Sequence, residues 1–158
     1  MKKRELDNMF KERFGFLFTD FRFKIISSKK ENWGYKLVAA NLTTGVEITY
    51  EFREAYIEVN LFKLIDGKII NNMQHAMRND DPMLGFGLGW VIMLKKPEAR
   101  IKSAYEYEIN FIDYSLMVAD RLKEYASDIL NGDFSSFDAL NTMVKEYWKE
   151  YFKNQNSP

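Results

Sequence analysis

The chain has 158 residues, of which 46% are hydrophobic and 16% aromatic, so the composition predicts a folded domain and excludes a disordered segment. Lysine plus arginine and aspartate plus glutamate each total 23, which removes the usual electrostatic argument for nucleic-acid binding. The absence of cysteine excludes disulfide bonds, thiolate catalysis and cysteine-based metal sites, and it is consistent with a reducing compartment. We therefore expect a cytoplasmic protein.

A short amphipathic helix is predicted at the N-terminus. Apolar residues recur at three- and four-residue steps over residues 4–14, and Gly15 stands where such a helix would stop. Glu5 and Asp7 follow the basic start of the chain, where a signal peptide would need an apolar run. The mature chain is therefore expected to begin at Met1.

Four or five sequential strands follow this helix, joined by short links. The predicted strands are residues 21–25, 34–42, 46–52, 55–65 and, after the Asp66-Gly67 turn dipeptide, 68–70. Apolar and polar residues alternate most clearly over 46–52. Because parallel neighbours would need crossovers of a dozen residues or more, the short links favour an antiparallel meander.

Two longer helices are predicted at the C-terminal end. Apolar residues keep helical spacing over 112–129 and again over 137–151, with Gly132 between them. The predicted fold class is α+β: an antiparallel four- to five-stranded meander with an N-terminal helix and a C-terminal helical hairpin packed on one face. We expect a single domain over residues 1–152 and a frayed tail over 153–158.

The glycine-rich segment Met83–Leu94, "MLGFGLGWVIML", lies in the region whose secondary structure is least clear. Its G-x-G-x-G spacing, with no predicted strand before it and no G-K-[ST], does not fit a phosphate-binding loop. Its twelve residues are too few to cross a bilayer, which needs about twenty. Two interpretations stay open: Phe86, Leu88 and Trp90 enter the core where the glycines let the backbone pass close to the sheet, or they form a contact surface for a partner.

One candidate enzyme site, with a weak sequence signal, surrounds His75, the only histidine. Arg78, Asp80 and Asp81 are its neighbours and could form an acid–base site, or a hard-cation site with the two aspartates as oxygen ligands. Adjacent aspartates before a proline are more typical of a turn, and a single histidine excludes the two-histidine zinc sites. We therefore expect no catalytic residue, no cofactor and no metal, and keep this site as an alternative.

Several other charged residues have two interpretations. Glu47 with Glu51, and Glu106 with Glu108, stand at strand-like spacing and are predicted to be solvated surface. Arg53 stands at the predicted tip between two strands, where it either recognises a partner or solvates the turn.

The segment Leu122–Leu140, "LKEYASDILNGDFSSFDAL", resembles the closing signature of a group of small bacterial α+β proteins, L-x-x-Y-A-x-D-I-L-x-G-D-F-x-x-F. Several proteins of this group are immunity-type partners of polymorphic toxins. The resemblance implies an N-terminal helix, an aromatic-rich sheet and a binding role, and it brings no catalytic residues. In physical terms, Gly132 can end the first helix in a left-handed conformation, and Phe134 and Phe137 can pin the two helices together.

The sequence therefore predicts a non-catalytic protein that binds another protein, with an immunity-type partner of a bacterial toxin as the specific form of this hypothesis. Neither nucleic acid nor a membrane is an expected partner. Two alternatives stay open. The first is an enzyme with the site around His75, and the second is a homo-oligomeric module that uses the second face of the sheet or the Trp90 segment as its interface.

Overall fold

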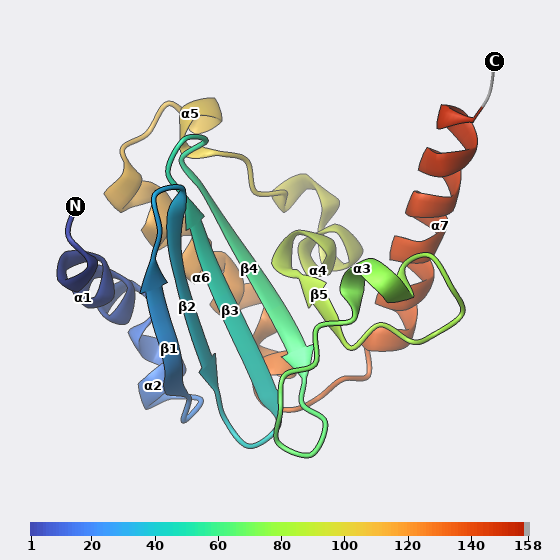
Figure 1. Ribbon diagram of the computed structural model, residues 1–158, viewed down its shortest axis with the longest axis horizontal. Coiled ribbons are helices and arrows are strands. Elements are labelled where there is room, and N and C mark those ends of the chain that lie inside the picture. The colour runs from blue at the N-terminus through green and yellow to red at the C-terminus, as the bar shows by residue number, and fades with distance from the viewer. Residues whose placement is uncertain (157–158) are drawn as a thin grey trace.

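A computed structural model describes residues 1–156, which form an antiparallel sheet and a layer of helices (Figure 1). The strands, in their spatial order, are β1 (Lys24–Lys30), β2 (Gly34–Ala40), β3 (Thr44–Glu51), β4 (Tyr56–Lys63) and β5 (Gly85–Gly87). The helices are α1 (Lys3–Arg13), α2 (Gly15–Thr19), α3 (Met73–Ala76), α4 (Leu88–Lys95), α5 (Ala104–Tyr107), α6 (Phe111–Leu130) and α7 (Phe137–Gln155), with a 3₁₀ turn η1 (Pro97–Ala99). This confirms the predicted α+β meander.

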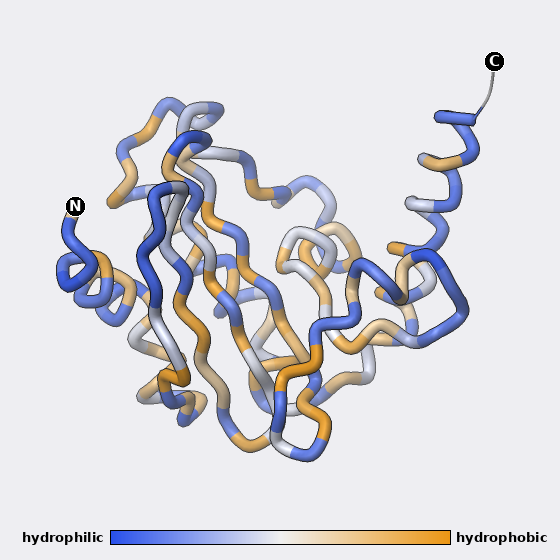
Figure 2. The backbone as a smooth tube through the Cα atoms, viewed as in Figure 1, coloured by the Kyte–Doolittle hydropathy of each residue, from blue (hydrophilic) through white to orange (hydrophobic). Residues whose placement is uncertain are grey.

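Alternation of apolar and polar residues gives the sheet two different faces. In β3, Val46 and Ile48 are fully buried, whereas Glu47 between them is partly exposed. Ile48 is paired with Leu37 of β2 and with Val59 of β4, so one row of buried aliphatic side chains crosses the central strands. Figure 2 shows the resulting alternation of hydrophobic and hydrophilic residues along the strands.

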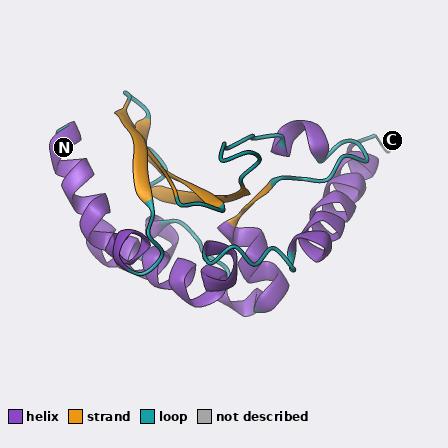
Figure 3. Ribbon diagram, turned by 90° about the horizontal axis from the view of Figure 1, so that it is seen from below, coloured by secondary structure: helices purple, strands orange, loops and turns teal. Residues whose placement is uncertain are grey.

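Most of the helices, α1 and α6 among them, lie on one side of the sheet, whereas α3 lies toward the other side, beyond β4 (Figures 1 and 3). The side of the central strands opposite α6 is open (Figure 3). The core between the layers is aromatic: the ring of Phe10 lies 5.0 Å from that of Tyr35. Tyr50 of β3 stacks on Phe111 of α6 with 4.0 Å between ring centroids. Such rings bury large apolar areas, which is why the covered face holds the domain together.

The N-terminal elements differ in detail from the prediction. The first helix spans Lys3–Arg13 and ends one residue before the predicted end at residue 14, and Gly15, predicted to stop it, opens the short helix α2. The chain turns at Arg22, which has a φ of 60°, so the strand expected over 21–25 starts only at Lys24. β1 then continues through the polar run to Lys30, because its backbone pairs with β2 along that length.

The region after β4 contains the largest departure from the prediction. The strand expected over 68–70 is reduced to a single bridge between Ile65 and Lys68. A Cβ at Gly45 would come within 2.4 Å of Ile69, so this glycine lets the loop after β4 lie against the sheet. The loop therefore covers the lower end of the face that carries no helix.

The glycine-rich segment forms β5 and then α4. Gly85 is paired with Phe62 of β4, and a Cβ there would lie 2.4 Å from the Phe62 ring. The glycines thus let the backbone pass close to the sheet, as one of the two interpretations predicted.

The two predicted C-terminal helices are present and are joined at Gly132 with a φ of +84°. The second of them, α7, packs against α4 and diverges from α6 (Figure 1). Phe134 and Phe137 contact each other edge to face at 5.1 Å. The second helix, α7, continues to Gln155, so the chain is helical beyond the start of the tail expected over 153–158. Residues 157–158 of that expected tail lie outside the described residues.

Candidate functional site

The face of the sheet opposite the helices carries a group of glutamates. Glu47 and Glu51 occupy alternate positions of β3, and Glu58 occupies the matching face of β4. The antiparallel register places Glu51 opposite Tyr56, and Glu54 follows in the turn between the two strands. Local strand alternation and the β3–β4 pairing together gather these carboxylates on one surface.

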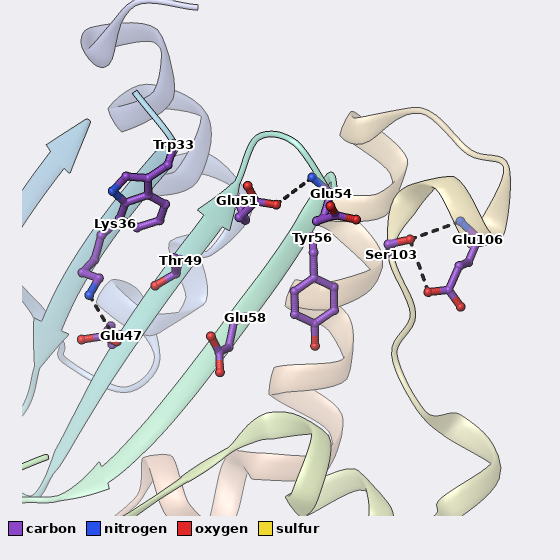
Figure 4. A pocket seen from close by; sticks show the side chains of 10 residues that line it. All are labelled: Trp33, Lys36, Glu47, Thr49, Glu51, Glu54, Tyr56, Glu58, Ser103 and Glu106. Atoms are coloured by element: carbon purple, nitrogen blue, oxygen red, sulfur yellow. Dashed lines mark hydrogen bonds and ion pairs between the residues drawn. The ribbon is translucent and has the colours of Figure 1, made fainter. Parts of the chain in front are cut away.

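These glutamates line a shallow hollow of about 570 Å³ (Figure 4). We call it the acidic hollow; its five glutamates are Glu47, Glu51, Glu54, Glu58 and Glu106. Trp33, Lys36 and Tyr56 are among the other residues that line it. Five carboxylates against one lysine give this surface a negative potential, although the whole chain is neutral.

The carboxylates influence one another. Lys36 Nζ lies 3.7 Å from Glu47 Oε1, a loose ion pair across β2 and β3. Partial burial raises the pKa of the Glu58 carboxyl and the charge of Glu47 raises it further, against the opposing effects of Lys36 and a hydrogen bond to Asn60. Burial, followed by the charge of Glu58, raises the pKa of the Tyr56 hydroxyl. Ionisation of Glu58 in the hollow therefore has an electrostatic cost.

One glutamate of the hollow and a helix cap support the local backbone. The carboxylate of Glu51 accepts hydrogen bonds from the backbone N–H groups of Arg53 at 3.2 Å and Glu54 at 2.7 Å. Ser103 caps α5 by accepting the N–H of Glu106 at 3.3 Å. In Figure 4, Tyr56 lies between the β3 carboxylates on one side and this helix cap on the other. The hollow is thus braced by a turn and by a capped helix.

A larger and more apolar hollow, of about 820 Å³, adjoins the first. Tyr56, Glu58, Ser103 and Glu106 line both. Its apolar lining includes the side chains Met73, Met77, Met83, Met93, Trp90, Tyr147 and Trp148. We call it the methionine groove; it lies where α3, α4 and α7 surround the β5 end of the sheet (Figure 1).

The structure separates the four residues that the sequence suggested for partner binding. Phe86 and Leu88 are buried, with 1% and 2% of their surface exposed, so they pack in the core and offer no contact surface. Trp90 is half-buried, lines the methionine groove and contacts Tyr147 edge to face at 5.1 Å. Arg53 is 90% exposed at the β3–β4 turn, beside the acidic hollow.

The residues of the alternative enzyme site lie on an exposed surface around α3. His75 Nε2 is 3.8 Å from Asp81 Oδ2, with 79% and 65% of the two side chains exposed. Arg78 lies over the ring of Phe152 at 4.7 Å, and Asp80 is exposed. Within residues 1–156, no group of three or more histidines, aspartates and glutamates is placed to hold a metal ion.

Comparison with known proteins found no relative of the chain. No protein-family model, curated protein or solved structure matches the chain. The resemblance of Leu122–Leu140 to immunity-type proteins therefore stays a prediction. In the described part of the chain, every helix is too short or too polar to cross a membrane.

The acidic hollow was not predicted from the sequence, because its residues come from segments that are separate in the chain. Glu47 with Glu51, and Glu106, were expected to be ordinary solvated surface. The signal that was available is the shared period of two: it places Glu47 and Glu51 on one face of β3 and Glu58 on one face of β4. Only the register of the two strands shows that these faces coincide.

Proposed function

We propose that this protein is a non-catalytic binding module that docks another protein on the open face of its sheet. The acidic hollow carries the proposal: it gathers the glutamates of β3, β4 and their turn with Glu106 of α5, over strands whose other face is covered by the long helices. The partner is expected to present lysine or arginine side chains, since complementary charge speeds association and fixes register. The exposed Arg53 lies at the border of this surface and would limit how far a basic segment extends.

A protein partner explains the shape of the site better than a metal ion or a small molecule does. The carboxylates are distributed along two strands, a turn and a helix cap, and they do not converge on one point. Small-molecule sites usually enclose most of their ligand, whereas this hollow is shallow. Trp33 and Tyr56 add aromatic surface, and aromatic residues are common at the centre of protein interfaces.

We extend this proposal to a cytoplasmic immunity-type protein that neutralises a bacterial toxin. The support is the resemblance of Leu122–Leu140 together with the negative potential of the open face. A neutral chain can carry such a face because its charges are unevenly distributed along the sequence: residues 1–40 hold ten basic and five acidic residues. Steering of a basic partner depends on this local potential and not on the net charge.

Capture from the cells that produce the protein tests the proposal. The full chain and the variant Glu47→Gln/Glu54→Gln/Glu58→Gln are used as baits, and bound proteins are quantified by mass spectrometry. The expected result is one protein with a basic surface segment, recovered at least about tenfold less with the variant, because lost charge pairs weaken the complex. Titration calorimetry with the purified partner then gives the affinity of each bait.

The control bait carries Glu12→Gln/Asp120→Asn/Glu124→Gln, which changes the net charge equally on exposed positions of α1 and α6. It is expected to retain the partner as the unmodified chain does. A partner that both variants lose equally would contradict the proposal, as would a partner that both variants retain.

A further inference from the structure

The acidic hollow and the methionine groove adjoin each other, and we call the two together the depression. They share four lining residues, Tyr56, Glu58, Ser103 and Glu106, so the two parts are direct neighbours. A chain segment lying in the acidic hollow and running toward β5 would therefore enter the groove directly. The two parts differ in chemistry, since one is lined by carboxylates and the other mainly by thioethers and aromatic rings.

The groove is suited to receive apolar side chains of varied shape. Met93 at its edge is 36% exposed and Tyr147 is 50% exposed, so apolar surface is available to a partner. Methionine side chains are unbranched and flexible, which lets such a surface adapt to what it binds. Trp90 and Trp148 supply rigid aromatic walls.

The charges along the depression define a direction. Glu58 and Glu106 stand at the shared wall, whereas Arg100 and Lys102 line the groove. A basic side chain is attracted to the acidic end and repelled where Arg100 and Lys102 lie. A segment with basic residues followed by apolar residues therefore fits in one orientation only.

We propose that the methionine groove binds bulky apolar side chains of the same partner segment whose basic residues occupy the acidic hollow. This inference rests on the proposed function and specifies the chemistry of the partner: a run of lysine or arginine next to leucine, phenylalanine, methionine or tryptophan. The apolar part supplies affinity through burial, and the basic part supplies orientation.

Gly89 offers a way to block the groove without disturbing the fold. It lies in the first turn of α4, is exposed and lines the groove, and a Cβ there meets no atom within 4 Å. Gly89→Leu therefore fills part of the groove, and it replaces glycine by a better helix former. Gly15→Leu is the matched control, because a Cβ at Gly15 in α2 also meets no atom within 4 Å and Gly15 does not line the groove.

The test is a selection of displayed random peptides on the immobilised full chain. The peptides are about 16 residues long, enough in extended form to reach across both hollows. The expected result is enrichment of peptides in which a basic run adjoins bulky apolar residues. Fluorescence titration of the selected peptides should show about tenfold weaker binding to Gly89→Leu and unchanged binding to Gly15→Leu, since one apolar anchor is excluded.

The other outcomes separate this inference from the proposed function. Basic peptides without apolar residues, bound equally by Gly89→Leu, would overturn the inference and leave the acidic hollow as the binding site. Peptides that bind Glu47→Gln/Glu54→Gln/Glu58→Gln as well as they bind the unmodified chain would overturn both proposals. A selection that enriches no peptide would also overturn both.

Discussion

Glu58 is a residue of the acidic hollow whose ionisation opposes folding. Its carboxyl has a raised pKa because partial burial and the charge of Glu47 both disfavour ionisation. The folded chain then holds a proton at pH values where the unfolded chain has lost it. The contribution of Glu58 to stability is therefore full below the ordinary pKa of 4.5 and is lost as the pH rises through the raised value.

The variant Glu58→Gln is expected to melt at the same or a higher temperature than the unmodified chain at neutral pH. It removes a charge that the fold disfavours and keeps a side chain of similar size. Thermal unfolding followed by circular dichroism between pH 4 and pH 8 measures the effect, with Glu124→Gln on α6 as the control. A clearly lower melting temperature for Glu58→Gln at neutral pH would show that the Glu58 carboxylate stabilises the fold.

Asp7 changes the pH dependence of stability in the opposite direction to Glu58. Burial would raise the pKa of its carboxyl, but hydrogen bonds from Lys3, Tyr35 and Ser28 outweigh burial and lower it from 3.8 to about 2. The Tyr35 hydroxyl donates to Asp7 Oδ1 at 2.6 Å, so this carboxylate joins α1 to β2. A lowered pKa in the folded state stabilises the fold above pH 3.8, and this stability is lost as the pH falls toward about 2.

Asp7→Asn is therefore expected to lower the free energy of unfolding at neutral pH by about 1–2 kcal/mol, after a discount for screening by solvent. Urea unfolding at a series of pH values measures this loss. The variant should also lose less stability than the unmodified chain between pH 4 and pH 2. If the two chains keep the same difference in stability down to pH 2, the Asp7 network does not contribute as described. Glu12→Gln, at an exposed position of α1, is the control.

At the scale of elements, the β2–β3 turn fastens the sheet to the end of α6. The Thr44 hydroxyl is buried and donates to the carbonyl of Ile129 at 2.8 Å. Asn41 Nδ2 donates to the carbonyl of Leu130 at 3.0 Å. The last carbonyls of a helix have no partner within the helix, so these two side chains supply hydrogen bonds that α6 cannot make itself.

Thr44→Val keeps the shape of the side chain and removes the donor to Ile129. The expected cost is about 0.5–1.5 kcal/mol of unfolding free energy, the usual net contribution of one hydrogen bond. The carbonyl of Ile129 is not left unpaired, because it still accepts the backbone N–H of Gly132 at 2.9 Å. Chemical unfolding monitored by tryptophan fluorescence measures it. Thr49→Val, on the open face of β3, is the matched control and should change stability little. Equal effects of the two substitutions would contradict the role assigned to Thr44.

The elements that could be predicted from the sequence are those with a strong local period. β3, α6 and α7 each bury one face over several turns or residue pairs, so apolar spacing is enough to find them. β1 continues through polar residues because it pairs with β2, and the three residues of β5 are a strand only because they pair with β4. Long-range pairing of this kind leaves no local pattern in the sequence.

At the scale of the whole molecule, the chain is a sheet with one covered and one open face (Figure 3). The acidic hollow could not be predicted from the net charge, because a chain with a net charge of zero can still have five glutamates in one hollow. The same limit applies to the predicted contact residues. Phe86 and Leu88 are buried in the core. Trp90, on the first turn of α4, is half-buried and lines the methionine groove.

We propose that the open face of the sheet is the surface that binds the partner. Nuclear magnetic resonance of the isotope-labelled full chain, titrated with the purified captured partner, tests it most directly. We expect the amide signals of β3, β4 and the β3–β4 turn to shift, together with the indole signal of Trp33, while the amide signals on the outer surface of α6 stay unchanged. Shifts confined to the helical layer, with the signals of β3 and β4 unaffected, would contradict it.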